Sequence, residues 1–295
     1  MKFSAILVLL MAGMAGCARA EQRYNVVGMV IKAEPEHREV VVSCRAIPGY
    51  MEAMAMSFTV RDARELDGVA PGESIEFTLV VDGNNSFAEK IRVLAYESLE
   101  RDPSTARRLG YLGKLLGPST AADELRCGQA IPDFSLIDQN RHRVKLSQFT
   151  GKVVALTFIY TRCPLPNYCF RLSNNFGLLQ TRFANRMGRD LILLSISFDP
   201  LHDQPDVLAQ YGTVWRADAR GWRLLTGPPE QVQKICRMFG VDSWAEEGLL
   251  THSLHTAVVD RDGKLAANIE GNQFTAQQLG DLVQSVMDCP KKAGP

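Results

Sequence analysis

Two patterns of apolar and polar positions divide the chain into two regions. Between residues 21 and 98, short segments that alternate apolar and polar residues are separated by turn residues such as Pro71-Gly72 and Asp82-Gly83. Alternation with a period of two residues is typical of β-strands with one buried face. Five such segments predict a small all-β barrel. The expected strands are residues 24–32, 40–44, 58–60, 75–81 and 87–96.

The second region, residues 127–295, alternates apolar runs with segments of helical period. Its strongest run, Val153 to Tyr160, is rich in β-branched and aromatic residues and predicts a strand buried on both faces. Strands that alternate with helices predict an α/β sheet covered on both sides. Residues 99–126 are expected to form a helical connector, with a helix from Ser104 to Leu116, and a linker. The expected strands are 134–136, 153–160, 191–196, 223–225, 256–260 and 265–269, and the expected helices are 167–187, 204–215, 230–239 and 275–287.

Residues 1–20 combine one early lysine with a short apolar core and predict a signal peptide. Met14 to Cys17 resembles a bacterial lipobox, which implies a lipid on Cys17 and a periplasmic, membrane-anchored lipoprotein. Cleavage after Ala18-Arg19-Ala20, giving a soluble exported protein, is the alternative. The formal net charge is zero, so charge gives no reason to expect a nucleic acid or an anionic membrane surface as a partner.

Cys163 and Cys169 follow the strongest predicted strand, at the position where reactive groups gather in α/β sheets. A regular helix would point these residues in different directions, but Pro164 and Pro166 predict an irregular loop that can bring the sulfurs together. A cysteine just before a helix also has its thiolate favoured by the helix dipole. The pair therefore suits metal or redox chemistry, with a structural disulfide as the alternative.

Four sulfur-bearing residues cluster in the first region. Met54 and Met56 alternate at strand period, so their thioethers are expected on one side, with Cys44 and Met51 near enough to join them. Thioethers and thiolates are soft ligands that select Cu(I) or Ag(I). Methionines that only fill the core are the alternative interpretation.

The segment from Ile47 to Phe58, with Leu79 to Gly83, resembles the periplasmic CusF-type copper-binding domain. This resemblance implies an OB-like barrel and places the paired methionine ligands of that family at Met54 and Met56. The usual histidine ligand falls at Cys44, and the aromatic residue that caps the metal falls at Met51.

His252 is the most diagnostic histidine of the second region. Thiol-disulfide oxidoreductases of the thioredoxin-like fold usually carry a cis-proline just before the corresponding strand, but residues 230–287 contain no proline. Two thiolates from Cys163 and Cys169 and one imidazole would make a three-coordinate site for Cu(I), with Cu(II) as the alternative.

The second region resembles the Sco/SenC family of copper-delivery proteins, which implies a thioredoxin-like fold. By position, the resemblance implies that Cys163, Cys169 and His252 are the copper ligands, although five residues separate these cysteines where the family usually has three. The matching pieces are Gly128–Phe134, Thr157–Pro164, Cys169, Ser197–Pro200 with Asp203, Leu225–Gly227 and His252-Ser253.

The resemblances imply a copper metallochaperone that delivers copper to an exported cuproprotein, with the dinuclear copper centre of a cytochrome c oxidase subunit as the expected acceptor. Such a protein need not be an enzyme. One alternative is a thiol-disulfide oxidoreductase or peroxidase that uses the cysteine pair. Another is a protein that buffers copper or confers resistance to it, with no acceptor.

The remaining histidines and cysteines are weaker candidates. We expect His37 and His142 on the surface and Cys236 in the core. His202 and His255 are weak candidates for outer neighbours of the metal site, and the roles open to Asp199 are to orient His252, to tune the thiols or to form a turn. Cys127 with Cys289 are either a structural pair or unpaired.

Overall fold

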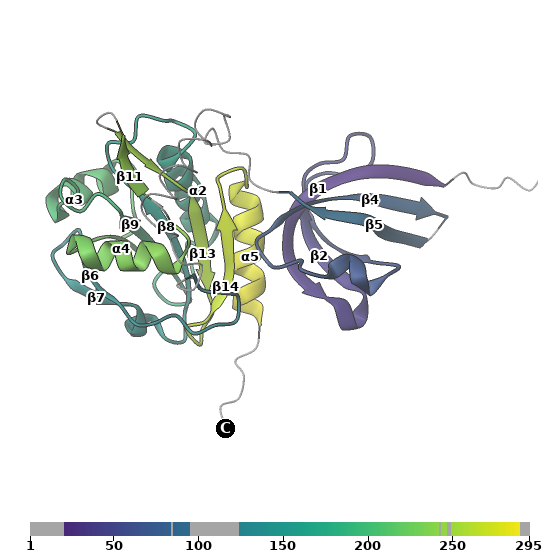
Figure 1. The fold of residues 1–295 in the computed structure, drawn as a ribbon, viewed down its shortest axis with the longest axis horizontal. Helices are drawn as coiled ribbons and strands as arrows, with labels where there is room; N and C mark the ends of the chain where they lie inside the picture. The colour runs from purple at the N-terminus through teal and green to yellow at the C-terminus, as the bar shows by residue number, and fades with distance from the viewer. Residues whose placement is uncertain (1–20, 84, 95–123, 242, 247–248, 290–295) are drawn as a thin grey trace, which may run out of the picture.

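The computed structural model describes residues 21–83, 85–94, 124–241, 243–246 and 249–289, which form two domains (Figure 1). The predicted signal peptide and the predicted helix from Ser104 to Leu116 lie outside these residues. The domain boundary expected near residue 98 also lies outside them, so it stays a prediction. Among the helices described, none is both long enough and apolar enough to span a membrane.

The first domain is a five-stranded antiparallel sheet that curls into a barrel. Its strand order is β3-β2-β1-β4-β5, and a parallel bridge between Val60 and Ala88 joins the two edges. Val26, Val40 and Val42 point into the core. The all-β, OB-like fold is confirmed. The strands are β1 (Gln22–Glu34), β2 (Glu39–Cys44), β3 (Ala55–Thr59), β4 (Ser74–Asp82) and β5 (Asn85–Val93).

The second domain is built on a seven-stranded mixed sheet with the order β14-β13-β8-β9-β10-β6-β7. Its central strands β8, β9 and β10 run parallel, whereas β13 and β6 run antiparallel to their central neighbours. The strands are β6 (Ser135–Asp138), β7 (Arg143–Lys145), β8 (Val153–Ile159), β9 (Leu191–Ser197), β10 (Trp222–Thr226), β13 (His255–Val259) and β14 (Leu265–Glu270).

Helices cover both faces of this sheet, as predicted. Along β8, Val154 and Leu156 pack into the core beneath α3 and α4, while Val153 and Ala155 pack into the core beneath α2 and α5. The thioredoxin-like α/β fold is confirmed. The helices are α2 (Cys169–Arg182), α3 (Pro205–Val214), α4 (Pro229–Met238) and α5 (Ala276–Asp288).

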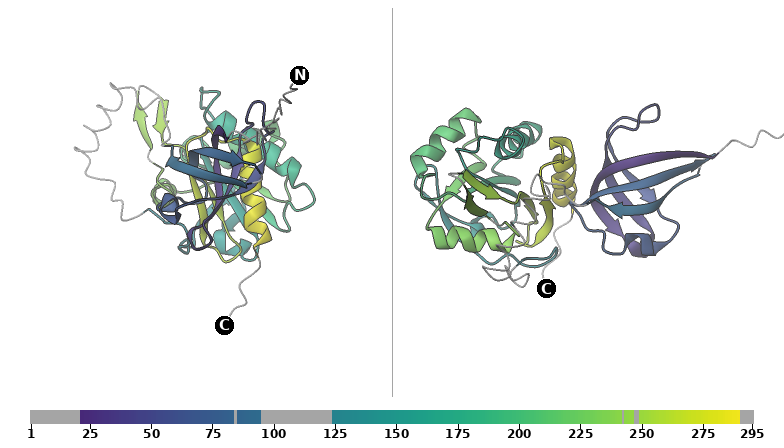
Figure 2. Two further views of the ribbon diagram at one scale, coloured as in Figure 1. Left: turned by 90° about the vertical axis from the view of Figure 1, so that its right-hand side faces the viewer. Right: turned by 45° about the horizontal axis from the view of Figure 1, so that its top comes forward.

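Three short strands were not predicted from the sequence. β7 has three residues and too few positions to show alternation. β11 (Ser243–Glu246) and β12 (Leu249–His252) form a separate two-stranded hairpin before β13, which stands out from the domain in the left view of Figure 2.

The barrel packs against the second domain through α5, which lies between the two sheets in Figure 1. Met29 of β1 is fully buried in the same cluster as Leu279 and Val283 of α5. Polar groups also match across this contact, because the Ser43 hydroxyl donates to Asp281 at 2.7 Å and Gln278 donates to the Ser43 carbonyl at 3.1 Å. Burial of apolar surface stabilises the contact, and the paired polar groups keep its hydrogen bonds satisfied.

Candidate metal centre

The cysteine loop lies at the carboxyl end of β8, as predicted. Cys163 is partly buried, and Cys169 is 1% exposed and is the first residue of α2. The helix thus begins two residues later than the predicted start at Asn167. The loop between the cysteines is irregular, and the Asn272 side chain donates a hydrogen bond to the Asn167 carbonyl.

The two thiols lie close together. Burial raises the pKa of the Cys169 thiol well above its ordinary value, and a hydrogen bond with the Cys163 side chain raises this pKa further. For Cys169, burial therefore outweighs the helix dipole, which alone would favour the thiolate. Neither cysteine is joined in a disulfide in the structure. A metal that binds here would have to displace the Cys169 proton, whereas an oxidant could join the sulfurs as a disulfide.

A buried carboxylate fixes the chain just before Cys163. Asp203 is fully buried and accepts from the Thr161 backbone at 3.0 Å and from the Thr161 hydroxyl at 2.6 Å. The Ser197 hydroxyl also donates to it at 2.5 Å. Because these bonds join the end of β8 to the loop after β9, they hold the cysteine loop in place.

Asp199, also buried, accepts from Arg162 at 2.7 Å and bonds with His202 Nδ1 at 2.8 Å. His202 thus contacts the loop through Asp199. The expectation that Asp199 orients His252 stays a prediction, because the His252 side chain is not among those described. The sequence alone did not single out Arg162, which binds the buried Asp199. Its place directly before Cys163 is the signal that could have indicated this contact.

Tyr211 of α3 was also missed. Burial raises the pKa of its phenol, and the nearby Cys169 and Cys163 add to this effect. Its hydroxyl lies 2.7 Å from that of Ser173. Nothing in the local sequence around Tyr211 distinguishes it from a core aromatic residue, so only the fold brings it near the cysteines.

The topology brings the His252 backbone to the same end of the sheet as the cysteines. β13 runs antiparallel to β8, with Thr256 opposite Thr157 and Val259 opposite Val154. The segment that precedes β13 therefore lies beside the carboxyl end of β8. His252 is the last residue of β12, in this segment. Its side chain is not among those described, so its role as a ligand stays a prediction.

The pairing of β2 with β3 brings Cys44, Met54 and Met56 near one another along the chain backbone. Met56 is opposite Val42, whose side chain lies in the barrel core, and the Cys44 backbone N–H donates to the Met54 carbonyl at 2.9 Å. Met54 is 46% exposed, whereas Met51 and Met56 are partly buried against the core. An incoming metal ion can therefore reach Met54 directly, and the other two methionines lie deeper.

Cys44 is the least accessible of the predicted barrel ligands. It is 2% exposed, and burial raises the pKa of its thiol to about 12. We expect Cys44 to resist alkylation at pH 8, because only about one thiol in ten thousand would be ionised. Mass spectrometry after iodoacetamide treatment would check this, with the exposed Cys289 as the reactive control. Labelling of Cys44 as fast as Cys289 would contradict the expectation.

The other cysteines and histidines divide between core and surface. Cys236 is buried in the core and His142 is exposed, as expected. Cys127 and Cys289 are both free and exposed, so the expected alternative that they form a structural pair is wrong. His255 is 7% exposed, and burial lowers its pKa to about 4, so its imidazole is neutral at physiological pH.

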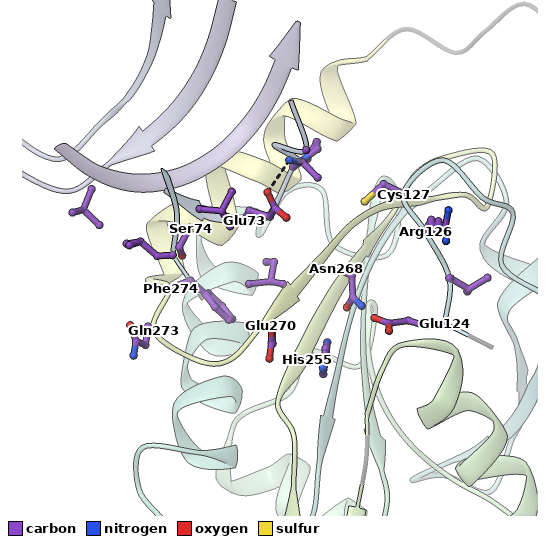
Figure 3. A pocket seen from close by; sticks show the side chains of 18 of the residues that line it. Glu73, Ser74, Glu124, Arg126, Cys127, His255, Asn268, Glu270, Gln273 and Phe274 are labelled. Carbon is purple, nitrogen blue, oxygen red and sulfur yellow. Dashed lines mark hydrogen bonds between the residues drawn. The ribbon is translucent and has the colours of Figure 1, made fainter. Parts of the chain in front are cut away.

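A cavity of about 790 Å³ lies between the barrel and the second domain, and we call it the interdomain cavity (Figure 3). Its lining includes Glu73, Glu124, Cys127, His255 and Asn268, and none of the predicted ligands. Within the described part of the chain, no three His, Cys, Asp or Glu side chains are grouped to hold a metal ion. The His252 imidazole is outside the described side chains.

Comparison with known proteins gives matches to both domains. Residues 123–288 match the family described as SCO1/SenC, and residues 23–92 match the copper binding periplasmic protein CusF. Protein sco1 of Schizosaccharomyces pombe is 28% identical over 169 residues, which cover 54% of this chain and 61% of that protein. A SCO2-like protein of Rickettsia typhi is 27% identical over 152 residues, which cover 48% of this chain and 69% of that protein.

A SCO1/SenC family lipoprotein from Bacillus anthracis has a solved structure that aligns with a TM-score of 0.49 at 22% identity, over 54% of this chain and 95% of that one. The first family match covers more than half of the chain. Copper, predicted from the soft sulfur donors, is also the metal of the matched barrel family. The chain therefore belongs to the SCO1/SenC family and carries an N-terminal CusF-like domain.

Proposed function

We propose that this protein is a copper metallochaperone that binds copper through Cys163, Cys169 and His252. The observation that carries the proposal is the close pair of thiols at the end of β8, with the segment that bears His252 at the same end of the sheet. Two thiolates and an imidazole suit Cu(I). The thioethers of Met54 and Met56 hold Cu(I) less firmly than two thiolates, so transfer from the barrel to this site would be downhill.

The proposed acceptor is an exported copper protein, with the dinuclear copper centre of a cytochrome c oxidase subunit as the first candidate. Membership of the SCO1/SenC family supports this choice. The test is to mix two equivalents of the Cu(I)-loaded protein with the copper-free soluble domain of that subunit. A one-electron oxidant such as ferricyanide is then added, because only the oxidised, mixed-valence centre is visible by absorption and EPR.

We expect the loaded protein to form the centre and a His252→Ala variant to fail. Formation at the same rate from a Cu(I)–chelator complex alone, with no chaperone present, would contradict delivery. The identity of the acceptor would be wrong if the protein kept its copper in the presence of this domain.

We further propose that the protein is exported to the periplasm and anchored by a lipid on Cys17. The lipobox-like segment and the match to a periplasmic domain support export. The expected result is incorporation of labelled palmitate into the wild-type protein but not into a Cys17→Ser variant. Release of the wild-type protein into the soluble periplasmic fraction would instead favour cleavage after Ala20.

Thiol-disulfide exchange is a second candidate function, because Cys163 and Cys169 lie within hydrogen-bonding reach. A reductase would reduce an acceptor disulfide without copper and without His252. Thiol counting on the acceptor, after mixing with the copper-free His252→Ala variant, separates this function from copper delivery.

A further inference from the structure

The loop between β14 and α5, residues 271–275, contacts the segments that carry the proposed copper ligands of the second domain, and we call it the bridging loop. The Gly271 backbone N–H donates to the Leu254 carbonyl at 2.6 Å, in the segment between β12 and β13. The Asn272 side chain donates to the Asn167 carbonyl, which lies between the two cysteines in the chain. The bridging loop is therefore bonded to both segments of the proposed metal centre.

The barrel segment that carries Cys44 is bonded to the second domain on both sides of this cysteine. Before it, the Ser43 carbonyl accepts from Gln278 of α5 at 3.1 Å. After it, Arg45 donates to the Gln273 carbonyl of the bridging loop at 3.2 Å. Ser43 is fully buried, so water does not compete for its bonds. These contacts fix the position of Cys44 relative to the bridging loop.

The barrel segment that carries Met54 meets the same part of the second domain. Gln277 of α5 donates at 3.0 Å to the carbonyl of Ala53, which directly precedes Met54. Phe274 of the bridging loop (Figure 3) adds an apolar anchor, because it is 3% exposed and shares a core cluster with Met29 of β1. Separating the domains would expose this ring to water, which costs free energy.

One carbonyl oxygen joins the two copper-binding regions directly. The Gln273 oxygen accepts from Arg45 at 3.2 Å and also from Arg171 of α2 at 3.4 Å. Arg45 directly follows Cys44, and Arg171 is two residues after Cys169. Two residues beside predicted ligands in different domains therefore meet at a single atom.

We propose that the bridging loop docks the barrel as a fixed copper donor to the cysteine loop, with Arg45, Gln277 and Gln278 as positioning residues. Cu(I) passes within one chain: its bonds to the barrel thioethers break, bonds to the two thiolates form, and the thiol protons pass to water, with no change in oxidation state. A docked donor is already in place, whereas a flexible tether gives an effective concentration of only about a millimolar. This inference rests on the proposed binding of copper at both sites.

The test measures transfer within one chain by anaerobic stopped flow, with the full chain in excess over Cu(I) supplied as a chelator complex. Near-ultraviolet absorption reports the formation of Cu(I)–thiolate bonds. Capture by the barrel becomes faster as the protein concentration rises, whereas transfer within one chain does not, so the plateau rate reports transfer. The chain with Met54 and Met56 changed to leucine should show no plateau, because copper then reaches the cysteine loop only from solution.

Gln278→Glu is the first variant. Gln278 accepts from the Thr275 backbone N–H at 3.0 Å, and glutamate can do the same, so the cap of α5 is kept. The carboxylate cannot donate to the Ser43 carbonyl and repels it, which loosens the barrel. We expect the plateau rate to fall at least about tenfold. The matched control is Gln284→Glu, because the Gln284 side chain bonds to Asp288 within the same helix.

Arg45→Ala is the second variant, and it keeps the test decisive if Gln278→Glu does not fold, because Arg45 is exposed. It should lower the plateau rate while the Cu(I) affinities of both sites stay as in the parent. Its matched control is Arg64→Ala, at an exposed barrel arginine that bonds to Asp62. Thermal unfolding is measured alongside, since a role confined to stability would lower the unfolding temperature and leave the plateau rate unchanged.

The inference is overturned if neither variant lowers the plateau rate, if the controls lower it equally, or if the parent shows no plateau although its cysteine loop binds Cu(I). In each of these cases copper delivery stands and only the docked route is wrong. A parent whose cysteine loop binds no Cu(I) would instead overturn the proposed function, and this inference with it.

Discussion

Replacing His252 with alanine is expected to abolish tight Cu(I) binding by the second domain. The imidazole is one of three proposed ligands, and loss of even an outer partner of a metal ligand costs about 10- to 100-fold in affinity. Competition against a chromophoric Cu(I) chelator would measure the change, in a chain whose Met54 and Met56 are leucine so that the barrel does not contribute.

The same variant should keep the cysteine chemistry, because the Cys163 and Cys169 side chains hydrogen-bond with each other. Thiol counting before and after mild oxidation should show a disulfide at the wild-type rate. His142→Ala, at an exposed histidine, is the control for nonspecific loss. An unchanged affinity in His252→Ala would remove this histidine from the ligand set.

Changing Met54 and Met56 together to leucine should remove Cu(I) and Ag(I) binding by the barrel while leaving its fold intact. Leucine conserves volume, so each change should cost less than ~1.5 kcal/mol, and less at Met54, which is 46% exposed. Isothermal titration with Ag(I) would measure binding, and thermal unfolding would measure stability, in a chain with Cys163 and Cys169 changed to serine.

A methionine outside the sulfur cluster gives the matched control. Met29 is buried against α5, away from the barrel core, so Met29→Leu should leave Ag(I) binding unchanged. If the parent bound no Ag(I) and the Met54/Met56 variant lost stability well beyond the expected cost, the methionines would be core residues only.

The fold could be predicted largely from periodicity because burial imposes it. The run from Val153 to Tyr160 has Thr157 as its one polar residue, since β8 is covered on both faces, and β2 begins with alternating burial because one of its faces is more exposed there. The hairpin β11–β12 was missed because its strands have four residues each and pair only with one another.

The candidate site was only partly predictable. Two prolines and a preceding strand indicated that Cys163 and Cys169 could meet, and the thiols do lie together. The burial of Cys169 and Cys44 could not be read from their neighbours in sequence, because it depends on packing against distant strands and helices.

X-ray absorption spectroscopy at the copper edge tests most directly whether Cys163, Cys169 and His252 form one site. The sample is the chain with Met54 and Met56 changed to leucine, loaded anaerobically with one equivalent of Cu(I). The account predicts two sulfur ligands and one imidazole nitrogen, with the nitrogen lost in His252→Ala. Coordination by sulfur alone, or a nitrogen that persists in His252→Ala, would contradict it.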